Sequence, residues 1–188
     1  PPRFYWKTLS EMNAVPLIGM SVDANANPLD HSHRVVPGAD MFIAGYGKVL
    51  PVFDRAAMIA LLLPMGDLSS EVSLAGVSSS ESARGYGDPM LEFDINLIGP
   101  NAIKDIPDMM RYEPGFSVDL VIDLAFPIGE YDENQRLNIG QNRWYGRGGF
   151  PMIWQIGAWV PGRRTTLEAF PSVWLFGDND DFGGKTLE

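Results

Sequence analysis

Hydrophobic and polar side chains alternate along several stretches of this chain. In residues 91–97 (LEFDINL), every odd position is apolar and every even position is acidic or an amide. Residues 115–127 (GFSVDLVIDLAFP) repeat the pattern, with an apolar residue at each even position from Phe116 to Phe126. Because successive side chains of a strand point to opposite faces, both stretches predict strands with one apolar and one polar face.

The alternation recurs along most of the chain and predicts an all-β, antiparallel fold. Glycine (20) and proline (15) are frequent and widely spread, which is typical of strands joined by turns. We expect one helix, at residues 101–112, interrupted by Pro107. A chain of 188 residues predicts a single domain over residues 1–188. Candidate strands fall at residues 13–24, 41–53, 55–64, 69–77, 86–97, 115–127, 142–157 and 164–176.

The direction of the apolar faces separates two kinds of protein. In a soluble lipocalin-like or β-sandwich ligand-binding protein, apolar faces form a dry core and polar faces meet water. In an up-and-down transmembrane β-barrel, apolar faces meet lipid and polar faces line the interior. Several candidate strands have 10–13 residues, which is closer to the about 9–11 of membrane strands than to the about 5–6 of globular ones. Length and the clustering of aromatic residues near strand ends favour a barrel of about eight strands.

The polar faces carry charges of both signs, which become cross-strand neighbours if consecutive strands pair. In a barrel these side chains would line the lumen, set its electric field and hold any plug, without performing chemistry. The lumen-lining candidates are Glu92, Asp94, Asp119, Asp123, Arg143, Arg147, Arg164 and Glu168.

Composition excludes several functional classes. The net charge of −10, from 14 basic and 24 acidic residues, disfavours nucleic acid as a partner. Without cysteine the chain has neither disulfides nor thiolate chemistry. We find no nucleophile motif and expect no enzyme and no cofactor. His31 and His33 lack a third clear ligand, and residues 177–181 (GDNDD) lack the spacing of a calcium loop, so we expect no metal site.

Three motifs resemble one family of bacterial proteins. They are the Pro-x-Gly-Glu-Tyr-Asp turn at 127–132, the Asn-x-Gly-x-Asn-Arg-Trp run at 138–144 and the Trp-x-Phe-x-Asp-Asn-Asp-Asp strand end at 174–181. The opening PPRFYWKTL and residues 85–100 are also similar to it. The family is described as Putative MetA-pathway of phenol degradation, a transporter-like group of outer-membrane β-barrels.

The resemblance implies a porin-like barrel in the outer membrane of Gram-negative bacteria, with lipid and small hydrophobic or aromatic molecules as partners. It implies passage or uptake of these molecules, defines no catalytic residue, and leads us to expect C-terminal strands beyond Glu188 in the full-length protein. A soluble ligand-binding protein and a purely structural outer-membrane barrel remain the alternatives. No feature of the sequence indicates an oligomeric state, and the substrate is not specified.

Overall fold

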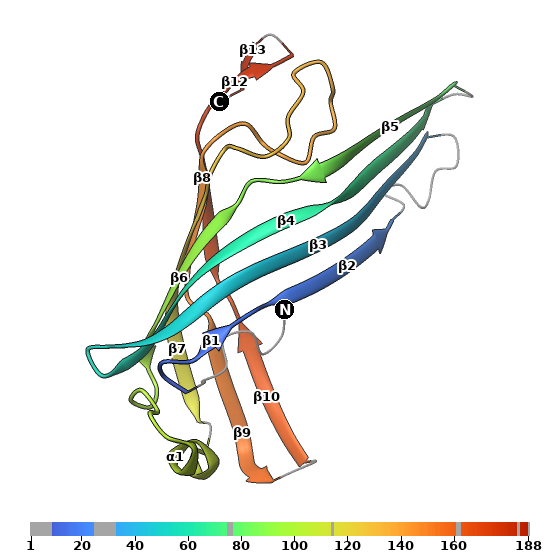
Figure 1. Ribbon diagram of the computed structural model, residues 1–188. Helices are drawn as coiled ribbons and strands as arrows, with labels where there is room; N and C mark the ends of the chain where they lie inside the picture. Colours follow the sequence, from blue (N-terminus) through green and yellow to red (C-terminus); the bar gives the residue numbers. More distant parts are fainter. Residues whose placement is uncertain are drawn as a thin grey trace.

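The computed structural model describes residues 9–24, 33–74, 77–113, 115–160, 163–183 and 185–187 as a coiled antiparallel sheet with one short helix (Figure 1). Eleven strands form the main sheet, and a two-stranded hairpin follows it. The predicted all-β, antiparallel fold is confirmed. In chain order the elements are β1 (Asn13–Ala14), β2 (Leu17–Asp23), β3 (His33–Val52), β4 (Arg55–Leu74), β5 (Val77–Tyr86), β6 (Met90–Ile98), α1 (Ile106–Arg111), β7 (Phe116–Ala125), β8 (Tyr145–Gly149), β9 (Met152–Val160), β10 (Arg163–Ala169), β11 (Ser172–Phe176), β12 (Asn179–Phe182) and β13 (Lys185–Leu187).

Segments that follow one another along the chain pair in the main sheet. β3 and β4 form its longest ladder, with 20 residues each, joined by a two-residue turn at Phe53 and Asp54. Both turn residues have positive φ (49° and 59°), as in a type I′ turn, whose twist matches that of paired strands. β1 and β2 pair with β3, while β5 and β6 share β4 as their partner. β7 then pairs with β6 on one side and with β8 and β9 on the other, and these pair with β11 and β10.

The sheet ends in free edges at β1 and β2 on one side and at β10 and β11 on the other, and β5 has β4 as its one strand partner among the described residues. No register joins these edges within the described residues, so the sheet is open there and a closed barrel stays a prediction. Figure 1 shows the sheet strongly coiled, with β3 and β4 steeply inclined to β7, β9 and β10. Such coiling accumulates from the right-handed twist of each strand.

The prediction of separate strands at 55–64 and 69–77 was wrong, because β4 includes all of the first range and the second as far as Leu74. Pro64 and Gly66 resemble turn residues in the sequence. However, Pro64 lies where β4 passes from one partner to the other, and its carbonyl accepts a hydrogen bond from the Gly87 amide (2.8 Å). The side of Pro64 that lacks an N–H therefore faces the connection between β5 and β6, where no strand carbonyl requires a hydrogen-bond donor. A Cβ at Gly66 would collide with the Asp40 carbonyl of β3, so this glycine permits close strand approach instead of a turn.

Other predicted strands have different limits in the structure. β3 begins at His33, well before the predicted 41–53, and β5 was missed because its serine-rich sequence (VSSSESARGY) lacks apolar alternation. Residues 142–157 form β8 and β9 in succession, and residues 164–176 lie within β10 and β11, each interrupted at a proline. In each case the ends of the strand depend on its pairing with a neighbouring strand, which the periodicity of the sequence does not predict.

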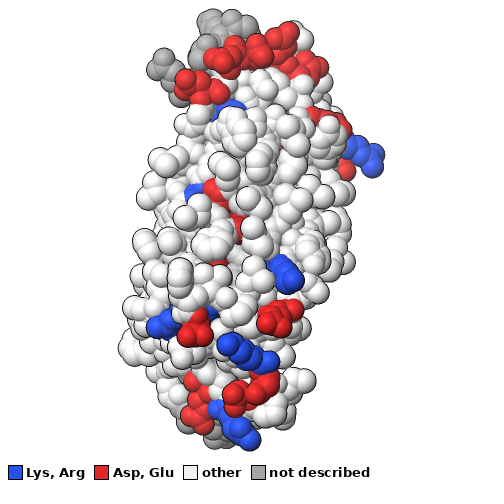
Figure 2. Space-filling view, turned by 60° about the vertical axis from the view of Figure 1, so that its left-hand side comes forward, with Lys and Arg blue, Asp and Glu red and all other residues white. Residues whose placement is uncertain are grey.

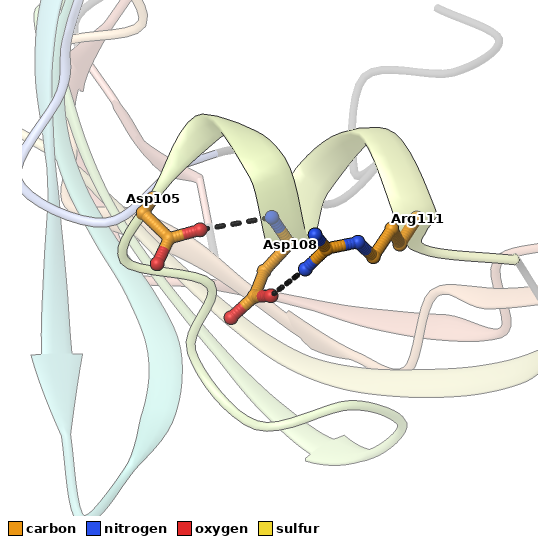
Figure 3. A network of polar contacts seen from close by, with 3 residues as sticks. All are labelled: Asp105, Asp108 and Arg111. Carbon is orange, nitrogen blue, oxygen red and sulfur yellow. Dashed lines mark hydrogen bonds and ion pairs between the residues drawn. The ribbon is translucent and has the colours of Figure 1, made fainter.

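The one described helix, α1, is shorter than the predicted 101–112. Asp105 caps its start, with Oδ1 accepting the Asp108 amide (2.8 Å), and Arg111 pairs with Asp108 at 3.4 Å (Figure 3). Pro107 lies in the first turn, where a missing N–H costs nothing, so it starts the helix instead of interrupting it. Among the described residues, no helix is long and apolar enough to span a membrane.

On β6 and β7 the alternation determines burial in an unusual sense: most polar side chains are buried, and most apolar side chains are more exposed. On β7, Asp119 and Asp123 are 0% and 2% exposed, whereas Ile122 and Leu124 are 50% and 41% exposed. A soluble sandwich would show the opposite arrangement, because its apolar faces form the core. In Figure 2 charged groups gather toward the two ends of the visible face, and the broad middle is mostly uncharged.

Candidate functional site

A cluster of charged and amide side chains lies on the buried face where β6, β7 and β8 pair. The antiparallel register places Glu92 opposite Asp123, Asp123 opposite Arg147, and Asn96 opposite Asp119. Directly opposed side chains in adjacent strands are close neighbours on one face. The strand period therefore brings together residues that are up to 55 positions apart, Glu92 and Arg147.

Asp123 and Arg147 form the ion pair at the centre of the cluster. Nε and Nη2 of Arg147 lie 2.6 and 2.5 Å from Oδ2 of Asp123. The Asp123 side chain is completely buried, and that of Arg147 is only 20% exposed. Because water screens this pair poorly, its two charges depend on each other far more than those of a surface pair do.

Asn96 connects the irregular end of β6 to β7. Its Nδ2 donates to Asp119 Oδ1 (2.5 Å), to the Val118 carbonyl (3.2 Å) and to the Ile98 carbonyl (2.9 Å). The pairing of β6 with β7 shifts register between Asn96 and Ile98, so the amide spans a bulge. Tyr112, just after α1, lies near the same carboxylates: burial raises the pKa of its hydroxyl, and the Asp119 charge raises this pKa further.

The structure brings five of the eight predicted lumen residues together: Glu92, Asp94, Asp119, Asp123 and Arg147. Four of these are acidic and one is basic, so the wall formed by β6 and β7 is acidic.

The other three predicted residues lie apart from this cluster. Arg143 precedes β8, donates to Gln141 Oε1 from Nε and Nη2 (3.3 Å each) and lies over the Phe176 ring. Glu168 lies on β10, opposite Ile153 of β9. The Arg164 side chain lies outside the described residues. For the two β10 residues the separation follows from the strand order, because β10 pairs with β9 and not with β6 or β7.

Sequence analysis missed two buried residues that hold the long connection 126–144. Asp88, at the break between β5 and β6, accepts the Gly129 amide on Oδ1 (2.9 Å) and the Gln141 amide on Oδ2 (2.8 Å). Asn179 donates from Nδ2 to Tyr131 Oη (3.1 Å) and to the Gln141 carbonyl (2.9 Å). We call Asp88, Asn179 and these partners the polar latch. The turn-like Gly87-Asp88-Pro89 and the motifs at 127–132, 138–144 and 174–181 contain the latch residues, but the sequence does not reveal which of these distant residues are partners.

The latch gives a first testable prediction. In Asp88→Asn one oxygen acceptor becomes an NH2 group facing a backbone N–H, so one buried hydrogen bond is lost. We expect the local opening free energy at the Gly129 and Gln141 amides to fall by about 1–3 kcal/mol, measured by hydrogen exchange. Asp178→Asn, the same change at an exposed residue near Asn179, is the control and should leave these amides protected. Equal exchange in Asp88→Asn and the unchanged protein would contradict the latch.

No group of three or more potential ligands suited to a metal ion occurs among the residues that the structure describes. His31 and the His33 side chain lie outside that part of the chain.

One known family matches a range of the chain that includes most of the sheet and all residues of the latch. The profile of the family described as Putative MetA-pathway of phenol degradation matches residues 20–186. The chain belongs to this family. The predicted family is thereby confirmed, and the matched range includes the segments at 127–144 and 173–184, which Asn179 joins in the latch.

Membership of the MetA-pathway phenol degradation family associates the chain, by the family name, with phenol degradation. The comparisons find no matching curated protein and no matching solved structure. The function of this family member must therefore be inferred from its own geometry.

Proposed function

We propose that this protein is a bacterial outer-membrane β-barrel through which small hydrophobic or aromatic molecules pass or are taken up. The observation that carries the proposal is the burial of Asp119 and Asp123 on β7 beside exposed Ile122 and Leu124. In water, an apolar face left exposed costs about 25 cal/mol per Å². In a bilayer the same face meets hydrocarbon, and the polar face is enclosed.

The outward face of β4 supports the proposal through the length of its apolar run. Its outward residues are apolar from Ile59 to Met65, each 39–44% exposed, and they become polar from Asp67 to Glu71. Arg84 of β5 pairs with Asp67 (3.4 Å) at this border. Ala57 lies on the same face of β4, so the apolar run on this face covers nine residues, 57–65. A strand needs about 9–11 residues to cross a bilayer. We infer that β4 crosses with its first half and extends beyond the membrane with its second.

The polar cluster supplies the interior that such a barrel needs. A lining with both signs of charge holds water, and polar solutes, more readily than an apolar core does. The role assigned to the cluster is to set the internal field, and no catalytic residue is assigned. The family name, which refers to phenol degradation, favours aromatic molecules as the cargo.

The proposal requires the free edges of the sheet to find partners. Backbone N–H and C=O groups of β2 and β10 would otherwise meet hydrocarbon, where each unpaired group costs several kcal/mol. We therefore propose that the sheet is closed in the membrane.

The test is fractionation of the natively expressed, full-length protein. We expect recovery in the outer membrane and a folded band that shifts on heating in detergent gels. Conductance across planar bilayers, or uptake of a small aromatic compound by cells that carry the protein, should follow. Recovery as a detergent-free soluble monomer would overturn the proposal in favour of a soluble ligand-binding protein. Membrane insertion with neither conductance nor uptake would favour a purely structural barrel.

A further inference from the structure

Aromatic rings form a row on the polar face of β8 and β11. The register places Tyr145 opposite Phe176, and Arg147 opposite Trp174. The Tyr145 and Phe176 centroids are 5.9 Å apart with planes inclined by 24°, and those of Trp174 and Phe176 are 6.2 Å apart at 17°. Both pairs are stacked, within the range of favourable aromatic contacts.

Two guanidinium groups lie over this row. The Cζ of Arg147 is 5.1 Å from the Trp174 centroid and 4.6 Å from that of Phe170. The Cζ of Arg143 is 4.6 Å from the Phe176 centroid. These distances are those of cation–π contacts, so the rings and guanidinium groups form one continuous structure. We call Phe170, Arg147, Trp174, Phe176 and Arg143 the aromatic ladder.

The ladder differs from other exposed aromatic residues because of the face on which it lies. Trp154 of β9 points outward with the apolar residues, as expected of a ring in lipid. Trp174 and Phe176 lie on the same face as buried Asp123, yet are 41% and 51% exposed. Their open ring surfaces therefore lie on the polar face of the sheet, opposite the face proposed to contact lipid.

The two arginines of the ladder differ in their charge balance. The Arg147 charge is compensated by Asp123 at 2.5 Å. Within the described residues Arg143 has no carboxylate at ion-pair distance, and its hydrogen bonds go to the neutral Gln141 side chain at 3.3 Å. Arg143 can therefore exchange these two long hydrogen bonds for charge-assisted ones to an anion.

We propose that the aromatic ladder binds planar aromatic carboxylates, with the ring stacked on Trp174 and Phe176 and the carboxylate paired with Arg143. This inference rests on the proposed function, whose cargo it specifies. A cationic aromatic would compete with the guanidinium groups already on the rings. A neutral aromatic would gain the stacking and leave the charge of Arg143 uncompensated, so it should bind more weakly.

The experiment is calorimetric titration of the folded full-length chain in detergent micelles with benzoate. Benzyl alcohol, which has the ring without the charge, and cyclohexanecarboxylate, which has the charge without the planar ring, are the comparison probes. We expect benzoate to bind most tightly. Trp174→Leu and Arg143→Gln should each weaken benzoate binding about tenfold or more. Trp154→Leu and Arg84→Gln, the same changes on the outward face, should leave it unchanged.

Three results would overturn the inference: no benzoate binding by the folded protein, benzoate affinity unchanged in Trp174→Leu and Arg143→Gln, or benzyl alcohol binding as tightly as benzoate. Folding of each variant is checked by its heat-shifted band, so a loss of binding cannot be confused with a loss of structure. A protein that inserts and conducts but does not bind benzoate contradicts the ladder alone. A detergent-free soluble protein that binds benzoate through these residues contradicts the barrel alone.

Discussion

Arg147→Gln should destabilise the protein by about 3–5 kcal/mol, because it leaves the buried Asp123 carboxylate without its cation. Asp123 is completely enclosed, and both Nε and Nη2 of Arg147 contact its Oδ2. Glu92 and Asp119 are buried on the same face, so the loss of Arg147 removes the positive charge from an acidic wall. Equilibrium unfolding in urea, with the protein in lipid vesicles, measures the change.

The control for this prediction is Arg84→Gln, the same substitution in an exposed ion pair. Arg84 lies 3.4 Å from Asp67, and the two side chains are 86% and 55% exposed. Water screens this pair, so we expect a change of about 0–1 kcal/mol. Combining Arg147→Gln with Asp123→Asn should recover part of the loss, since the double variant no longer buries the Asp123 charge without its cation. Similar losses for Arg84→Gln and Arg147→Gln would show that the central ion pair does not stabilise the cluster.

Ile122→Arg should cost about 2–4 kcal/mol in lipid vesicles, because it places a charge on the proposed lipid face near the middle of β7. Ile122 is 50% exposed, and its strand neighbours on that face are apolar. If this face met water, a half-exposed position would accept arginine with a change within about ±0.5 kcal/mol. The substitution therefore separates the two directions of the apolar face by the size of one measured free energy.

The matched control is Ile106→Arg, at the start of α1. Ile106 is 62% exposed but belongs to a polar connection between β6 and β7. We expect its substitution to change stability by about 0.5 kcal/mol or less. Equal, small effects at Ile122 and Ile106 would exclude lipid contact at Ile122 and support the soluble alternative.

The two predictions examine opposite faces of one strand. Asp123 and Ile122 are adjacent in β7, yet one is enclosed among charges and the other is open. If Arg147→Gln and Ile122→Arg both lower the free energy of unfolding by the expected amounts, the Asp123 face is a polar interior and the Ile122 face is an apolar exterior. In a water-soluble fold, by contrast, the buried ion pair would still matter while Ile122→Arg would be tolerated.

The sequence by itself determined which residues share a face. The separation of Asp123 from Leu124, and of Arg147 from the apolar residues of 142–157, follows from the two-residue period of an extended chain. This period is a local property of the backbone, so no knowledge of partners is needed. The same reasoning placed Glu92, Asp119 and Asp123 on one polar surface, which the register then brought together.

Only the tertiary structure decided where strands end and which polar residues meet. In the sequence Gly66 looks like a turn residue, but in the structure it lies within β4 and allows close approach of β3. The serine-rich β5 is a strand because it pairs with β4. Asp88 reaches Gly129 across 41 positions, and Asn179 reaches Tyr131 across 48. Arg143 and Phe176 likewise meet only because β8 pairs with β11. Pairing, close approach and hydrogen bonds between distant residues depend on register, and alternation along one strand carries no information about register.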